Sequence, residues 1–118
     1  DSVMNYPFYR NVLVFAAEGS IPASRFLGNV GFQRGNTHEA AYPLLWNLIG
    51  SHDTARILHL CGGDKARHRL AAAIQLLLPG MPMIYYGDEV AMTGGKDPDC
   101  RGSLDNRILL FYWGRATA

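Results

Sequence analysis

A histidine and an aspartate stand side by side at the end of an apolar run in the stretch NLIGSHDTAR, residues 47–56. A carboxylate beside a neutral imidazole offers hydrogen-bond acceptors and a donor, which suits a ligand with neighbouring hydroxyl groups. The same two residue types also occur as a mutually satisfied polar pair at a strand end. His52 and Asp53 are therefore candidates for a binding site, and the fold has to position them for that role.

A second group of charged residues lies in the loop GGKDPDCR, residues 94–101. Arg101 can hold hydroxyl groups while nearby carboxylates, Asp97 and Asp99, balance its charge. The alternative is ordinary turn chemistry in a loop rich in glycine and proline. Asp88 and Glu89 follow another apolar run, where a carboxylate pair is most typical of the start of a helix.

The remaining residues with metal-binding or redox chemistry give weaker signals. The run HLC, residues 59–61, has His52 and His68 nearby, but its spacing matches no zinc pattern, and we predict no metal and no cofactor. Two cysteines cannot form a disulfide framework. Reduced thiols in a cytoplasmic protein are favoured over a single bridge between Cys61 and Cys100.

Composition argues against several classes of partner. The 118 residues suit one globular domain, and the formal net charge of +1 with scattered basic residues predicts neither nucleic acid nor an anionic membrane as a partner. The longest apolar tract, residues 70–87, is interrupted by Gln75 and by Pro79-Gly80, so it does not predict a membrane span. There is no leader-like segment, and a chain that starts at Asp1 suggests an excised or processed piece.

The clearest predicted helix lies in DKARHRLAAAIQLLLPG, residues 64–80, with Asp64 as its cap and Pro79-Gly80 as its end. Its apolar residues are spaced to form one stripe, which we expect to face the core: Leu70, Ala73, Ile74, Leu77 and Leu78. The stretch MPMIYYGDE follows at once. Its continuous apolar residues predict a parallel strand that is covered on both faces.

The first half of the chain predicts two further strands and several helices. A short strand ends near Asn5, and a helix follows from Pro7 to Gly19. A second helix runs to Gly35 with Ser20 as its cap, and Phe26, Leu27 and Val30 share one face. Another helix is predicted from Thr37, and a short strand over residues 47–53.

The predicted order of strand, helix, helix, strand, helix, strand implies parallel strands with helical crossovers. That pattern is an α/β fold, with either an open sheet or a barrel. Ligands of such folds bind beyond the carboxyl ends of the strands, which is where His52 and Asp53 lie in the sequence.

The motifs NLIGSHDTARIL and LLLPGMPMIYYGDEVAMTGGKDPDCR resemble the α-amylase family of glycoside hydrolases, and within it the neopullulanase, cyclomaltodextrinase and maltogenic amylase group. DSVMNYPFY resembles the sixth strand of that family's barrel. The resemblance implies a partial (β/α)8 barrel, strands 6 to 8 with their helices, in residues 1–101. Residues 102–118 depart from the family pattern; NRILLFYWG within them predicts either an added strand or residues of vector origin.

The resemblance also implies roles for individual residues. Asp53 corresponds to the family's third catalytic carboxylate, which holds sugar hydroxyls and stabilises an oxocarbenium-like transition state. His52 would hydrogen-bond the same sugar, and Asp97 and Arg101 would hold glucose units further toward the non-reducing side. The implied ligand is an α-glucan or maltooligosaccharide. Asp88 and Glu89 match an element with a structural role.

No segment of the chain resembles the family's nucleophilic aspartate or its acid/base glutamate. A retaining glycosidase needs both, about 5 Å apart across the scissile bond. We therefore expect a fragment of an α-glucan-acting retaining hydrolase that is inactive or very weak alone. The alternative is a structural module of the same ancestry without a sugar function. Open strand edges pair with other chains, so self-association into a homo-oligomer that completes the barrel is expected in either case.

Overall fold

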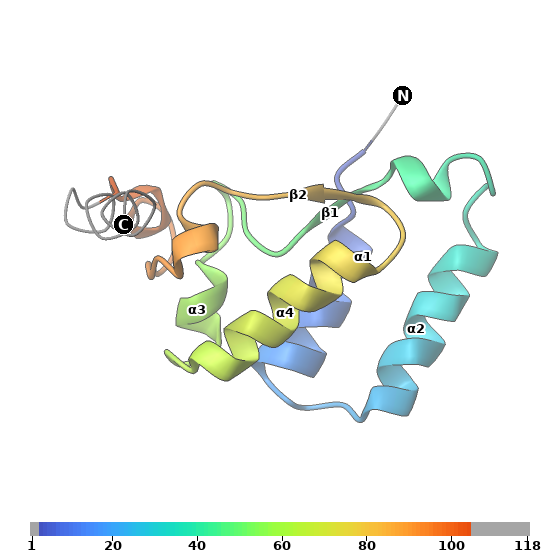
Figure 1. The fold of residues 1–118 in the computed structure, drawn as a ribbon, viewed down its shortest axis with the longest axis horizontal. Coiled ribbons are helices and arrows are strands. Elements are labelled where there is room, and N and C mark those ends of the chain that lie inside the picture. The colour runs from blue at the N-terminus through green and yellow to red at the C-terminus, as the bar shows by residue number, and fades with distance from the viewer. Residues whose placement is uncertain (1–2, 105–118) are drawn as a thin grey trace, which may run out of the picture.

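The structure is a computed structural model that describes residues 3–104, and Figure 1 shows their arrangement. Within these residues, four α-helices and two short strands form an α/β unit in which α1, α3 and α4 lie below the strands in the view of Figure 1, and α2 lies to the right of α1 and α4. The bounds are α1 Tyr6–Val12, α2 Ala23–Gly35, β1 Trp46–Leu48, α3 Ile57–Leu60, α4 Lys65–Leu77 and β2 Met81–Met83.

Three chain segments run parallel, as the predicted element order requires. β1 pairs with β2 in the register Trp46 to Met81 and Leu48 to Met83, and an isolated parallel bridge joins Met4 to Trp46. All three segments are shorter than predicted, and the first is a single bridge. β1 is therefore the central segment of the three, with its carboxyl end leading directly into residues 49–54.

The predicted burial of β2 on both faces is wrong for the described residues. Met81 and Pro82 are exposed and Met83 is only partly buried. Among residues 3–104, β2 pairs with β1 alone, and no described segment pairs with its other edge. Continuous apolar sequence marks a strand that needs cover on both sides, and the described residues supply that cover on one side only.

The helices enclose the hydrophobic core. Phe15 of the π-helical turn Leu13–Ala17, which continues α1, stacks on Phe26 of α2 with 4.7 Å between ring centroids. The core is built from residues of α1, the π-helical turn, all three later helices and the segment after β1: Phe8, Val12, Ala16, Ala17, Phe26, Ile49, Ile57, Cys61 and Ala71.

The helix starts follow from local hydrogen bonds. Asn5 Oδ1 accepts from the backbone N–H of Phe8 at 3.1 Å and caps α1, with Pro7 in the first turn. Asp64 caps α4 as predicted, because its Oδ1 accepts from the N–H groups of Ala66 at 2.8 Å and Arg67 at 3.2 Å.

Two predicted helix starts are wrong. α2 begins at Ala23 with Pro22 at the cap, while the Ser20 hydroxyl donates to the Val14 carbonyl at 3.1 Å. The segment from Thr37 forms turns and a 3-10 helix at Tyr42–Leu44 rather than an α-helix. The Thr37 hydroxyl donates to the Gln33 carbonyl at 2.8 Å, so it does not cap a helix that starts at Thr37.

The buried side of α4 is rotated away from the predicted stripe. Its buried residues are His68, Ala71 and Gln75, while Leu70 is exposed and Leu77 is 81% exposed. Gln75 Nε2 donates to the carbonyls of Asn47 at 3.0 Å and Met83 at 2.9 Å. A polar residue therefore faces the strands, because it satisfies backbone groups that an apolar residue would leave unpaired. Ile74 and Leu78 do pack against the core as predicted, whereas Ala73 is exposed. On α2, Phe26 is buried but Leu27 is exposed.

Several other predictions concern single features. Cys61 and Cys100 are free thiols, as predicted, and both are buried. No helix within residues 3–104 has the length and apolar character needed to cross a membrane. The prediction of an added strand in residues 106–114 lies outside the described residues.

Candidate functional site

The structure brings together the four residues that the sequence analysis predicts to contact a sugar. His52 Nε2 lies 3.2 Å from Asp53 Oδ2. Arg101 Nη2 lies 3.9 Å from Asp53 Oδ1, and Arg101 Nε lies 2.8 Å from Asp97 Oδ1. Two loops that are far apart in the sequence therefore contribute to one charged cluster, which we call the half-site: His52, Asp53, Asp97 and Arg101.

The half-site is open to solvent. The side chains of His52 and Asp53 are each 59% exposed, and Arg101 and Asp97 are about half exposed. Ion pairs this exposed contribute little to stability, typically about 0–1 kcal/mol. The cluster is thus not a major source of stability, and its donors and acceptors remain accessible to a ligand.

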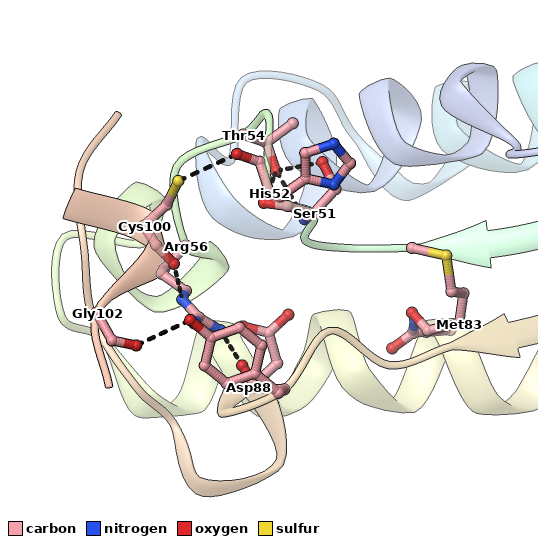
Figure 2. Close-up of polar contacts among 10 residues, drawn as sticks. Ser51, His52, Thr54, Arg56, Met83, Asp88, Cys100 and Gly102 are labelled. Atoms are coloured by element: carbon pink, nitrogen blue, oxygen red, sulfur yellow. Dashed lines mark hydrogen bonds and ion pairs between the residues drawn. The ribbon is translucent and has the colours of Figure 1, made fainter. Parts of the chain in front are cut away.

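Local hydrogen bonds hold the loop that follows β1. The Ser51 N–H donates to Thr54 Oγ1 at 2.9 Å, and Ser51 Oγ accepts from the Asp53 N–H at 3.2 Å. Ser51 is buried, so its hydroxyl and backbone form the inner wall of the loop. Figure 2 shows Ser51, His52 and Thr54 gathered at the turn after the β1 strand. These bonds fix the backbone of Asp53 next to its Arg101 partner.

The second loop contains a tight turn around Asp99. Asp99 Oδ2 accepts from the Gly95 N–H at 2.5 Å, and a methyl group placed on Gly94 would lie 2.6 Å from the Asp99 carbonyl oxygen. The turn chemistry considered for this loop therefore applies to Asp99. Asp97 instead pairs with Arg101.

A depression of about 590 Å³ adjoins the half-site. Asp53 and Asp97 line it together with Tyr9 of α1, which sequence reasoning missed. Burial raises the pKa of Tyr9, while a hydrogen bond with Thr54 opposes this effect. Tyr9 also meets Tyr6 edge to face, with centroids 6.3 Å apart. No local motif marked Tyr9, because only the packing of α1 against the strands brings it here.

Arg56 is the second residue that sequence reasoning missed. It is 1% exposed and its guanidinium lies over the rings of Tyr85 at 4.4 Å and Tyr86 at 4.6 Å. Its Nη1 donates to Asp88 Oδ1 at 3.2 Å. The available signal was Asp88 itself, because a carboxylate in a buried segment requires a partner.

Asp88 occupies a structural position. Burial raises its pKa to about 6, and the Arg56 guanidinium opposes that rise. Asp88 and Glu89 begin the 3-10 turn Asp88–Val90, which agrees with the helix-start interpretation. The chain from 3 to 104 contains no group of three His, Cys, Asp or Glu side chains placed to hold a metal ion.

A sequence model described as the alpha amylase catalytic domain matches residues 1–111. The chain belongs to the α-amylase family. Neopullulanase 2 from Thermoactinomyces vulgaris is 50% identical over 101 residues, which are 86% of this chain and 17% of that protein. The cyclomaltodextrinase of Thermoanaerobacter pseudethanolicus is also 50% identical over 101 residues, 86% of this chain and 18% of the relative.

Solved structures of this family have the same fold. The cyclic alpha-maltosyl-(1→6)-maltose hydrolase of Arthrobacter globiformis, in complex with cyclic alpha-maltosyl-(1→6)-maltose, is 36% identical with a TM-score of 0.85. The match covers 100% of this chain and 29% of that one. The resemblance to the neopullulanase and cyclomaltodextrinase group is thereby confirmed, and so is the α/β class of a family built on the (β/α)8 barrel. The chain spans less than a fifth of the length of the two curated relatives.

Proposed function

We propose that this chain supplies the sugar-contacting half-site of an α-glucan-acting retaining glycoside hydrolase. In this proposal residues 1–101 are strands 6 to 8 of the barrel with their helices. The observation that carries it is the position of Arg101, which lies 2.8 Å from Asp97 and 3.9 Å from Asp53 across two loops. Asp53 in turn lies 3.2 Å from His52. The bound ligand is an α-glucan or maltooligosaccharide.

The chemistry of the half-site suits a sugar ring. Carboxylate oxygens accept hydrogen bonds from neighbouring hydroxyl groups, and the guanidinium donates to hydroxyl oxygens. Asp53 is the residue to which we assign transition-state stabilisation, because a fixed carboxylate is favoured as positive charge develops on the sugar ring. His52 holds the same ring, and Asp97 and Arg101 hold the neighbouring units.

Bond cleavage requires two groups that we do not find in these residues. The family's nucleophilic aspartate and acid/base glutamate have no counterpart among the motifs of residues 1–118. Loss of covalent catalysis and of proton transfer each costs orders of magnitude in rate. We therefore propose that the isolated chain binds sugar weakly and hydrolyses it very slowly or not at all. A relative is named intracellular maltogenic amylase, which supports a cytoplasmic location.

The alternative is a self-associating module without a sugar function. Apolar side chains on and beside the two strands favour association: Trp46, Leu77, Met81 and Ile84 are all exposed. The edge of β2 that pairs with no residue within 3–104 offers backbone groups to a strand of another copy, and such pairing would complete the barrel. A monomer that persists in light scattering across a wide range of concentrations would argue against self-association.

Calorimetric titration with maltotetraose and with a cyclodextrin separates the two functions. We expect millimolar binding to the wild-type chain and a loss of at least about tenfold in Asp53→Asn and Arg101→Lys, because the first removes a charged acceptor and the second removes the planar fork of guanidinium donors. Glu39→Gln is the matched control, since Glu39 is exposed and lies outside the half-site. Equal affinity in all four proteins, or no binding by the wild type, would favour the structural module.

A further inference from the structure

Arg56 lies beneath the half-site without being part of it. It follows Asp53 by three residues and precedes α3, and its side chain is fully buried. Its backbone N–H donates to the Gly94 carbonyl at 2.9 Å, and its Nε donates to the Cys100 carbonyl at 2.9 Å. One residue of the first loop is thus bonded to both ends of the second loop.

The other end of the guanidinium reaches the segment after β2. Nη1 donates to the Tyr86 carbonyl and to Asp88 Oδ1. The Tyr86 hydroxyl then donates to the Gly102 carbonyl at 2.9 Å, immediately after Arg101. Figure 2 shows Arg56 at the centre of these contacts, between Cys100, Gly102 and Asp88. Three segments of the chain therefore meet at a single side chain.

A further bond closes the arrangement on the side of the half-site. Cys100 is completely buried, and its thiol lies 3.4 Å from the His52 carbonyl oxygen, to which it donates. Arg56, Cys100 and His52 thus form a continuous chain of contacts from the buried guanidinium to the exposed cluster. The residues at the two ends of the ion pair, Asp53 and Arg101, are direct neighbours of His52 and Cys100 in the sequence.

We propose that Arg56 is a positioning residue that sets the separation of Asp53 and Arg101 across the half-site. The exposed ion pair between those two residues is too weak to hold two loops in place. Buried hydrogen bonds from a charged donor are roughly twice as strong as neutral ones. The consequence for sugar binding rests on the proposed function, whereas the geometric claim stands on the contacts of Arg56 alone.

The main competing role for Arg56 is charge balance for Asp88. The groups that face its guanidinium are the two tyrosine rings, the carbonyls of Tyr86 and Cys100, and the Asp88 carboxylate. Arg56→Lys separates the two roles. Lysine keeps the positive charge beside Asp88, but a single ammonium lacks the planar fork that reaches carbonyls in opposite directions.

The test measures how well the buried thiol of Cys100 is protected. Native Arg56→Lys and wild-type chains are labelled with N-ethylmaleimide, and the rates at Cys100 and Cys61 are read by peptide mass spectrometry. Each rate is normalised to that of the same cysteine in the unfolded chain. We expect labelling of Cys100 to accelerate about tenfold, in line with the loss of about one charged hydrogen bond, with Cys61 unchanged. Cys61 lies in the core and serves as the internal reference.

Arg67→Lys is the matched control. Arg67 Nη1 donates to the Ala17 carbonyl at 2.7 Å, so this contact also joins a guanidinium to a carbonyl, but Arg67 is partly exposed and its hydrogen-bond and ion-pair partners do not belong to the half-site. This variant should leave the rate at Cys100 unchanged. If labelling of Cys100 and Cys61 accelerates by the same factor in Arg56→Lys, Arg56 only stabilises the whole fold, and the positioning role is wrong. If labelling of Cys100 does not accelerate, the proposal is also overturned. If Arg56→Lys fails to fold, the double variant Arg56→Met with Asp88→Asn replaces it, because this variant removes both charges. The labelling rate of Cys100 relative to that of Cys61 is then compared with the wild-type value in the same way.

Cyclodextrin titration of the same variants distinguishes this proposal from the proposed function. Positioning by Arg56 predicts weaker sugar binding in Arg56→Lys together with faster labelling at Cys100. If the wild type binds no sugar while the labelling result holds, the proposed function fails and the positioning role survives. Full sugar affinity in Arg56→Lys with exposed Cys100 would contradict the effect of Arg56 on the half-site.

Discussion

Gly50 and Asp88 lie so close together that a methyl group at residue 50 would be 2.3 Å from Asp88 Oδ2. Gly50 ends the run that follows β1, and Asp88 begins the turn that follows β2. The Asp88 carboxylate is also held by Arg56, so it cannot move aside freely. Contact between the carboxyl ends of the two strands thus depends on a residue without a side chain.

Gly50→Ala should therefore destabilise the fold by about 1–3 kcal/mol, the usual cost of forcing an extra group into a packed site. Gly28→Ala is the control, because a methyl group there would meet nothing within 4 Å on the surface of α2. That change should stabilise the helix by about 0.5–1 kcal/mol. Urea unfolding followed by circular dichroism measures both. Equal stability of the two variants would show that Gly50 and Asp88 are not in contact.

The Asp88 carboxyl should make stability depend on pH. Burial raises its pKa from 3.8 to about 6, so the folded chain binds this proton more tightly than the unfolded chain. The resulting stabilisation is fully present below about pH 3.8 and is lost as pH rises through about 6. Its size is at most about 3 kcal/mol at 1.36 kcal/mol per pKa unit.

Asp88→Asn removes this titration. The free energy of unfolding of the wild type, minus that of Asp88→Asn, should fall between pH 4 and pH 6 and stay level above pH 7. Urea titrations at several pH values provide the comparison, and Asp99→Asn serves as the exposed control. A difference that rises with pH in this window would mean that Arg56 outweighs burial and that the direction given for the Asp88 pKa is wrong.

Gln75 should contribute to stability through the two carbonyls that it satisfies, on Asn47 and Met83. Gln75→Met keeps the length of the side chain but removes its donors, so it should cost about 1–3 kcal/mol. Leu77→Gln is the control on the same helix. Because Leu77 is largely exposed, that change should stay within about 0.5 kcal/mol. Thermal unfolding of both variants measures the two stability losses. A larger loss of stability in Leu77→Gln than in Gln75→Met would mean that the predicted apolar stripe, and not Gln75, faces the core.

The sequence predicted the central parts of α1, α2 and α4 because their signals are local, but it missed α3 and predicted a helix from Thr37 that does not form. Asp64 followed by good helix formers, and Pro79-Gly80 at the end, mark α4 without reference to the rest of the chain. The buried side of α4 was mispredicted because Gln75 is buried in order to donate to the carbonyls of Asn47 in β1 and Met83 in β2. Hydrophobic periodicity carries no information about such a partner.

The half-site was predictable for a different reason. His52, Asp53, Asp97 and Arg101 lie at the ends of strands or in the loop beyond them, and the motifs that carry the family resemblance mark the same positions. The sequence did not predict Arg56 or Tyr9, because their contacts are with segments that are distant in the sequence and become neighbours only in the folded chain. Arg56 bonds to the Tyr86 and Cys100 carbonyls, which lie 30 and 44 residues away in the sequence, and Tyr9 lines the depression because α1 packs beside β1.

The most direct test of the account is to map sugar binding on the folded chain by amide NMR. Titration with a cyclodextrin should shift the amide signals of Asp53 and Arg101 together, with Gly28 on α2 unaffected, and Asp53→Asn should abolish the shifts in both loops. The half-site predicts that the amide signals of both loops shift together in the wild type and that neither loop shows shifts in Asp53→Asn. Sugar binding at the half-site would be contradicted if millimolar sugar shifted no amide signal. It would also be contradicted if the shifted signals all belonged to residues other than 51–54 and 94–101.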